Sequence, residues 1–137
     1  MGRSQLILES YTHLPLVTAF KTATSTGAGS TSLVISATAG QLWIVLSEAH
    51  YHDDIAARTV YEKLVSAGGD ACILATGTAI AGQVLRPTYL LAGLPVPIVL
   101  AGSRSITITV DGLNNGKIIT SHLCYYRMTG LGTWTDT

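Results

Sequence analysis

The densest group of side chains that could carry chemistry is the run from Glu48 to Asp54, which follows the apolar segment 42–46. If a strand continues through this run, its alternate residues share one face: Glu48, His50, His52 and Asp54. Two imidazoles and a carboxylate can hold a divalent metal with an open coordination position. The alternative, which we favour, is a polar loop leaving the strand end, with the histidines at a subunit contact. We therefore expect no metal, cofactor or catalytic residue, and a protein that is not an enzyme.

The pair His50 and His52 is similar to the His-x-His pair of cupins, which are metal-binding β-barrels. In cupins the pair follows a Gly-led strand, a Glu stands a few positions on, and a third His lies on a later strand. Here Gly40 precedes the pair by ten positions, and the next glutamate is Glu62. Only His122 is a candidate for the third imidazole. A cupin-like metal-dependent enzyme using His50 and His52 is our second alternative.

Other catalytic patterns are absent from the sequence. It has no Gly-x-Ser-x-Gly elbow and no Cys-x-x-Cys pair. Cys72 and Cys124 lie in apolar runs, which predicts two buried free thiols of raised rather than lowered pKa. The stretch from Gly112 to Lys117 lacks a phosphate-loop spacing and has Ile118 where a hydroxyl must reach magnesium.

Charged residues are scarce in this chain. Of its 137 residues 12% are charged and 47% are hydrophobic, against about 25% charged in a usual soluble domain. The basic residues are spread singly, which argues against nucleic acid, and no apolar run could span a membrane. The N-terminal apolar run is too short for a signal peptide, so we expect synthesis in the cytoplasm. The thin charge cover predicts that much of the surface meets other protein subunits.

Short β-prone segments separated by Gly, Asn or Pro predict an all-β fold, an antiparallel β-sandwich. In the segment 105–110, apolar and hydroxyl side chains alternate, so Ile106, Ile108 and Val110 should share the core face. The segment 111–116 predicts a tight connection between two antiparallel strands. Residues 53–69 fit either a helix or a strand, and we favour the strand.

Three parts are expected along the chain: an N-terminal strand or arm with a flexible loop (1–31), the sandwich domain (32–128) and a C-terminal tail (129–137). The loop segment 22–32 has no large side chain and no charge, so it should order only against something else, such as a neighbouring subunit. Trp134 in the tail is either a clasp on the domain's own core or an anchor on a neighbour.

Aromatic residues offer a third class of function, binding of a glycan by a fibre or receptor-binding domain. Tyr125 and Tyr126 are adjacent, so on a strand one enters the core and the other faces out. A glycan site there would depend on Tyr126 or Trp134.

Three segments together resemble the small jelly-roll virion proteins of tailed bacteriophages: 39–46 with its Gly-x-x-Trp strand, 58–61, and 94–106 with its Pro-apolar-Leu segment and Gly turn. The resemblance covers residues 32–128 and implies a jelly-roll-like sandwich with an extended N-terminal arm. It implies a capsid decoration or cement protein of the virion, a homotrimer packed on the major capsid protein, with no catalytic residues. A tail, connector or fibre component is the first alternative.

Overall fold

The computed structural model describes residues 14–66, 68–69, 71–84, 90–91, 94–95 and 98–130. Within these ranges the side chains of residues 72, 90–91 and 94–95 are not described. All regular structure in this part of the chain is β-strand, so the predicted all-β fold is confirmed. The described part of the chain contains no helix able to cross a membrane.

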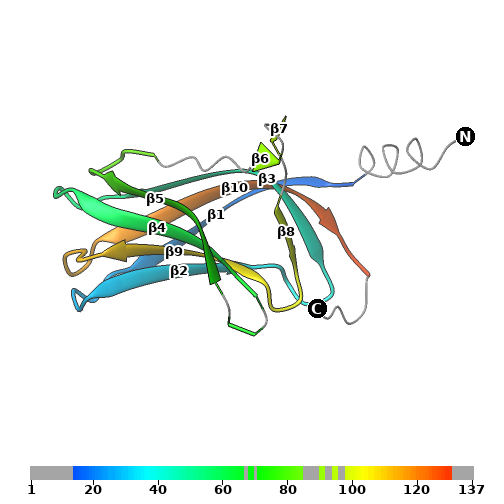
Figure 1. Ribbon diagram of the computed structural model, residues 1–137, viewed down its shortest axis with the longest axis horizontal. Helices are drawn as coiled ribbons and strands as arrows, with labels where there is room; N and C mark the ends of the chain where they lie inside the picture. Colours follow the sequence, from blue (N-terminus) through cyan, green and yellow to red (C-terminus); the bar gives the residue numbers. More distant parts are fainter. Residues whose placement is uncertain are drawn as a thin grey trace, which may run out of the picture.

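The described residues form ten strands, and Figure 1 shows how they are arranged. They are β1 (Leu16–Thr24), β2 (Ser30–Ser36), β3 (Leu42–His52), β4 (Arg58–Val65), β5 (Ala71–Ala79), β6 (Leu90–Leu91), β7 (Leu94–Pro95), β8 (Ile98–Ala101), β9 (Ser105–Asp111) and β10 (Ile118–Met128). β6 and β7 form only a two-residue ladder with each other.

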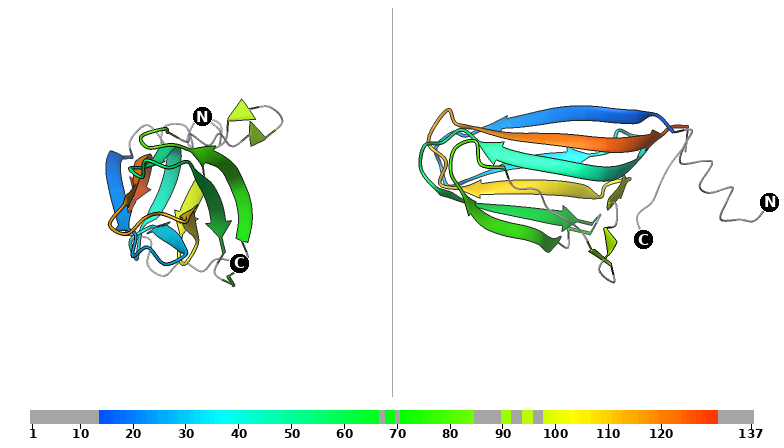
Figure 2. Two further views of the ribbon diagram at one scale, coloured as in Figure 1. Left: turned by 90° about the vertical axis from the view of Figure 1, so that its left-hand side faces the viewer. Right: turned by 90° about the horizontal axis from the view of Figure 1, so that it is seen from above.

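The other strands form two four-stranded antiparallel sheets, in the orders β1-β10-β3-β8 and β2-β9-β4-β5. We call them the first and the second sheet. The pairs β1 with β10, β2 with β9, β3 with β8 and β4 with β5 are nested like one long hairpin folded over. This nesting is the jelly-roll arrangement. Seen end on, the two sheets enclose the space that the core side chains fill (Figure 2).

The core lies between the sheets and is made of alternate residues from each strand. Ile106, Ile108 and Val110 are all buried in it, as the alternation in the sequence predicts. Tyr125 also enters the core, where its ring stacks on Trp43 with centroids 4.2 Å apart. Tyr126 belongs instead to a smaller apolar cluster with Leu42 and Ile44, which confirms that the two tyrosines point to opposite faces.

One boundary and one connection differ from the sequence-based expectation, and the open choice for residues 53–69 is decided. The sandwich begins at Leu16 rather than at Ser32, because β1 pairs with β10 over its full length instead of extending away as an arm. Residues 58–65 form β4, as favoured, and no helix is found in the described part of 53–69. The connection after Asp111 has the expected positive φ at Gly112 and Gly116, but it crosses between the sheets and forms no hairpin.

Two further expectations are only partly covered by the structure. Residues 1–13 of the expected arm, and Trp134 in the tail, lie outside the described residues. Cys124 is a free thiol but only half-buried, because even-numbered positions of β10 point away from the core. The side chain of Cys72 is not described.

The loops at one end of the sandwich are tied together by hydrogen bonds. The amide of Ser25 donates to the carbonyl of Lys117 at 2.7 Å, and that of Gly116 donates to the carbonyl of Ser25 at 2.9 Å. The amide of Ile118 donates to Oδ1 of Asp53 at 2.7 Å. These bonds fix the ends of β1, β3 and β10 relative to one another.

Candidate functional site

The run 48–54 lies mainly in a strand and not in a loop. β3 continues to His52, and Glu48, His50, His52 and Asp54 are all buried. The favoured interpretation, a polar loop with histidines at a subunit contact, is therefore wrong for His50 and His52, which face the core. The expectation of a shared face, made for the case of a continuing strand, is confirmed for Glu48, His50 and His52, while Asp54 is buried just beyond the end of β3.

A β-bulge turns these polar residues inward. Ser47 pairs with Cys124 and Val45 with Tyr125, so Leu46 is an extra residue without a partner in β10. Leu46 and Ser47 are both exposed, while Val45 before them and Glu48 after them are both buried. An extra residue shifts the alternation by one position, and bulges of this kind are common where a side chain must be re-aimed. Odd-numbered residues of β3 therefore face the core before the bulge and even-numbered ones after it.

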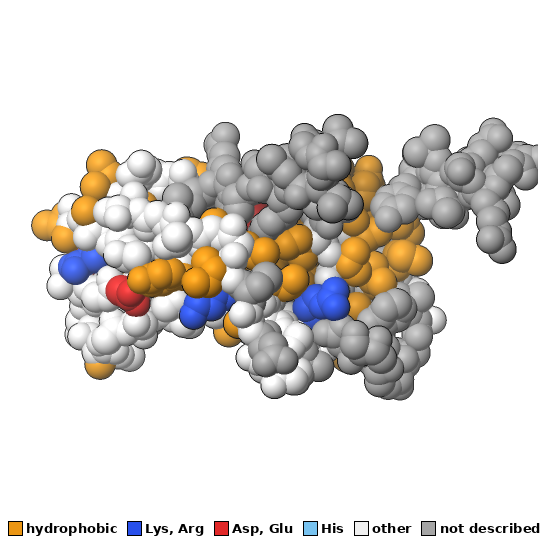
Figure 3. Space-filling model, in the orientation of Figure 1, with side chains coloured by type: hydrophobic (Ala, Val, Ile, Leu, Met, Phe, Trp, Pro, Cys, Tyr) orange, Lys and Arg blue, Asp and Glu red, His pale blue; other side chains and the backbone are white. Residues whose placement is uncertain are grey.

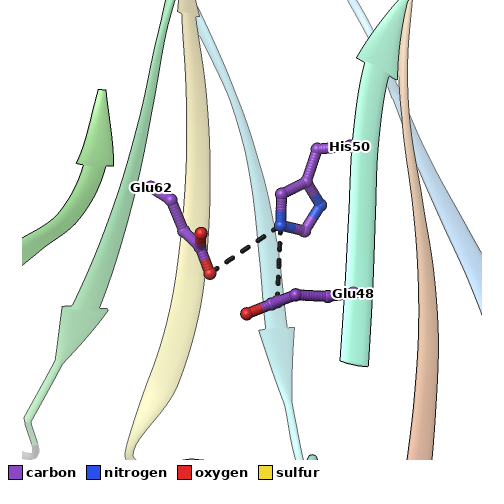
Figure 4. A group of neighbouring side chains, drawn as sticks. All are labelled: Glu48, His50 and Glu62. Carbon is purple, nitrogen blue, oxygen red and sulfur yellow. Dashed lines mark ion pairs between the residues drawn. The ribbon is translucent and has the colours of Figure 1, made fainter. Parts of the chain in front are cut away.

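A third side chain reaches this place from the opposite sheet. Glu62 of β4 is buried and points toward Glu48 and His50 of β3 (Figure 4). A second register shift lies beside it, because Glu62 pairs with Ala75 while Lys63 pairs with Ile73. Each of the two sheets thus carries a bulge next to its contribution to the cluster.

The cluster consists of one imidazole between two carboxylates. His50 Nε2 lies 3.3 Å from Oε2 of Glu48 and 3.7 Å from Oε1 of Glu62. His50 Nδ1 is hydrogen-bonded to Oγ of Ser121 at 2.8 Å, which fixes the orientation of the ring. One ligand atom from each of the three residues lies within 4.8 Å of the others.

The carboxylates control the protonation of the imidazole. Burial by itself lowers the pKa of His50, but the nearby Glu48 and Glu62 outweigh it and raise that pKa to about 9. In the metal-free protein at neutral pH, His50 is therefore an imidazolium held between two acids.

His52 does not belong to this cluster. Its Nε2 donates to the carbonyl of Ala79 at 2.8 Å, and its Nδ1 accepts from the amide of Asp54 at 3.2 Å. Both ring nitrogens are thus used, and His52 has none to offer a metal. His122 lies on the other face of the first sheet, stacked between Phe20 and Tyr51 at centroid distances of 5.9 and 5.8 Å. The three histidines considered for a cupin-like site are therefore not brought together.

Asp54 forms a separate network at the end of the sandwich. Its carboxylate accepts from the Asn114 amide at 2.9 Å and the Ala56 amide at 3.2 Å, and it pairs with Arg58 at 3.0 Å. The Asn114 amide contributes most to lowering the pKa of Asp54, to about 2, with Ala56 and Arg58 adding to it. This carboxylate holds two loops together and has no spare capacity for a ligand.

Glu62 is the functional candidate that the sequence did not identify. It stands fourteen positions after Glu48, in a segment whose register against β9 and β5 is not visible in the sequence. Its only sequence signal is an acid, between Tyr61 and Lys63, in a β-prone run. Comparison of the chain with protein-family models and with curated proteins found no match.

Proposed function

We propose that the protein is a structural subunit of a virion, a capsid decoration or cement protein. It forms an oligomer with itself, a homotrimer by our expectation, and packs on the major capsid protein. Two arguments support this proposal: the character of one face of the sandwich, and the resemblance of residues 32–128 to small jelly-roll virion proteins of tailed bacteriophages.

The observation that carries the proposal is the absence of charge from the outer face of the first sheet. On β1 and β10 this face consists of the even-numbered residues, and on β8 of Val99 and Ala101. On β3 it consists of Leu42, Ile44, Leu46, Ser47, Ala49 and Tyr51. None of these described outward positions is Asp, Glu, Lys or Arg.

Such a face costs little desolvation free energy when it contacts another protein. Burying a charged side chain costs free energy unless it is paired, and the charged residue that lines the hollow in this face, Glu48, is only 6% exposed before any contact forms. Leu16 and Phe20 of β1 and Leu46 of β3 already expose 57%, 68% and 46% of their surfaces. Three strands about 4.8 Å apart and some 30 Å long, with the four-residue β8 beside them, give a flat area on the order of 500 Å², over half of the roughly 800 Å² that one partner buries in a standard interface.

The middle of this face is hollowed. A shallow depression of about 490 Å³ is lined by Phe20, Ala49, His122 and Cys124, among others. β1 beside it is an edge strand, whose outer hydrogen-bonding groups have no neighbour in the sheet order. A second subunit can therefore reach both the hollow and an available strand edge.

Charge is also thin on another side of the molecule. On the face shown in Figure 3, the basic and acidic side chains stand apart from one another among hydrophobic and uncharged ones. On the second sheet, Val34 and Ile73 point outward together with hydroxyl side chains. This side offers a second surface for the capsid shell.

Self-association is tested by light scattering after gel filtration. We expect a mass above that of one chain, and we expect Phe20→Lys to shift the mass toward the monomer. Ile73→Lys is the matched control, since Ile73 is 61% exposed and lies on the second sheet. A wild-type protein that stays monomeric at high concentration would overturn the proposal.

The virion role is tested on purified virus particles from the source of the gene. Peptides of this chain should be found in them by mass spectrometry, and an antibody should label the shell. Labelling of the tail would replace the cement role by the tail, connector or fibre alternative. Absence of the chain from the particles would refute any virion role.

A further inference from the structure

The Glu48, His50 and Glu62 cluster has the features of a metal site, and neither the assembly surface nor the virion role uses it. We propose that these three side chains bind one divalent transition-metal ion, zinc or an ion of similar chemistry, between the two sheets. The proposal is independent of the proposed function, because all three residues lie inside a single chain.

The spacing of the three groups is that of ligands around an ion. Zinc is held at about 2.0–2.2 Å by nitrogen and oxygen, which places neighbouring ligand atoms of a tetrahedral site about 3.3–3.6 Å apart. The distances from His50 Nε2 to Glu48 and Glu62 are 3.3 and 3.7 Å. A charge-assisted hydrogen bond between the same groups would be about 2.7–2.9 Å long.

The imidazole is also placed as a ligand, and the incoming ion would displace the proton from its Nε2. His50 is 1% exposed, and its Nε2 points at both carboxylates at ion-pair distance, without a hydrogen bond to any described residue. The opposite ring nitrogen is held by Ser121 at 2.8 Å. Metal-binding histidines usually have their second nitrogen fixed in this way by a hydrogen bond. Ser121 is therefore a positioning residue for the site.

The ligand types select the class of ion. Calcium takes six to eight oxygens, and magnesium keeps an octahedral shell of oxygens and waters, so an imidazole between two carboxylates suits neither. One nitrogen and two carboxylate oxygens suit zinc, and manganese or iron less tightly. Three protein ligands leave a fourth position for a water molecule.

The ion would join the two sheets of the sandwich. Glu48 and His50 come from β3 of the first sheet, and Glu62 from β4 of the second. Metal binding to a site that exists only in the folded chain stabilises the fold. Loading should therefore raise the melting temperature.

The test uses the full chain, stripped of metal and refolded with and without Zn²⁺ or Co²⁺. We expect one Co²⁺ per chain with the visible absorption of a four-coordinate ion, and a higher melting temperature with Zn²⁺. X-ray absorption should show nitrogen and oxygen ligands with a single imidazole. Failure of the wild-type protein to bind either ion, or the finding of a sulfur ligand, would overturn the proposal.

Variants then locate the site. Glu62→Gln and Glu48→Gln should each weaken Co²⁺ binding at least tenfold, and Ser121→Ala about tenfold or more. His122→Gln is the matched control, because it removes an imidazole from the other face of the same sheet and should leave binding unchanged. Loss of binding in His122→Gln, or its retention in Glu62→Gln, would place the ion elsewhere. Because the wild-type titration and the ligand spectrum decide the proposal alone, a variant that fails to fold does not prevent a result.

Discussion

Two buried acidic sites, Asp54 and the pair Glu48 and Glu62, differ in the partners that surround their carboxylates. Asp54 is surrounded by donors at 2.9–3.2 Å, from two backbone amides, a side-chain amide and Arg58. Glu48 and Glu62 face His50 at 3.3 and 3.7 Å. The Asp54 carboxylate is fully hydrogen-bonded and holds two loops together. Glu48 and Glu62 come from different sheets and lie at distances from His50 that suit an ion between the three ligands.

We expect the largest change in the free energy of unfolding on substitution of His50, which tests whether the cluster is ionic. In the metal-free protein, His50→Gln removes the one base from between two acids, and breaking a buried ionic group typically costs about 3 kcal/mol of unfolding free energy. Adding Glu62→Gln to that variant should recover about half of the loss, because one of the two like charges is gone. Denaturant unfolding at pH 7 with a chelator present measures both changes.

The control for this prediction is His122→Gln on the outer face, for which we expect the free energy of unfolding to change by no more than about 0.5 kcal/mol. If His50→Gln is as harmless as His122→Gln, the cluster is not an ionic group at all. If Glu62→Gln makes His50→Gln worse, the two glutamates do not repel each other.

The sequence was sufficient to predict the parts of the fold that depend on local alternation. Ile106, Ile108 and Val110 could be assigned to the core because apolar and hydroxyl residues alternate without interruption. The common face of Glu48, His50 and His52 was also visible in their spacing. In both cases the period of a strand alone determines which residues go together.

The direction of that common face was not predictable, because a bulge determines it. Leu46 is neither Gly nor Asn, and only the pairing of β3 with β10 shows that it is the extra residue. The approach of Glu62 depends on which strands face each other across the sandwich, and this is a property of the whole topology. The apolar run before Glu48 suggested a strand end, whereas the strand continues as far as His52.

A smaller effect, with a distinct pH dependence, is expected at Asp54. The Asn114 amide, followed by Ala56 and Arg58, holds the pKa of this carboxyl at about 2, below its ordinary 3.8. A lowered pKa means that the ionised form stabilises the fold above about pH 4, and that this contribution is lost as the pH falls toward 2. Asp54→Asn should therefore be less stable than wild type at pH 5 and nearly equal to it at pH 2.

The measurement is the denaturation midpoint of both proteins from pH 5 to pH 2, in which the other carboxyl groups cancel. The loss at pH 5 should stay below that of His50→Gln, since asparagine keeps one oxygen for Asn114 and the Arg58 side chain, 21% exposed, can reach water. Asp111→Asn is the control, because the side-chain hydrogen bond that Asp111 accepts from Ser30 is exposed. A difference between wild type and Asp54→Asn that is constant over this range would show that Asp54 does not titrate with a lowered pKa.

The smallest effect concerns how rigidly Asp54 holds Arg58. Gly112 and Gly29 both have φ of +72°, and the amide of Gly112 donates to the carbonyl of Gly29, so the two are neighbours in equal conformations. A Cβ at Gly112 would lie 3.2 Å from Nη1 of Arg58, whereas one at Gly29 meets nothing within 4 Å. Gly29→Ala should lower the free energy of unfolding by about 1 kcal/mol, from the left-handed backbone alone. Gly112→Ala should lower it by about 0.5 kcal/mol more, because its Cβ also crowds Arg58. In the Asp54→Asn background Arg58 is free to move aside, so the excess at Gly112 should disappear. An excess that persists there would show that the guanidinium is fixed by something other than Asp54.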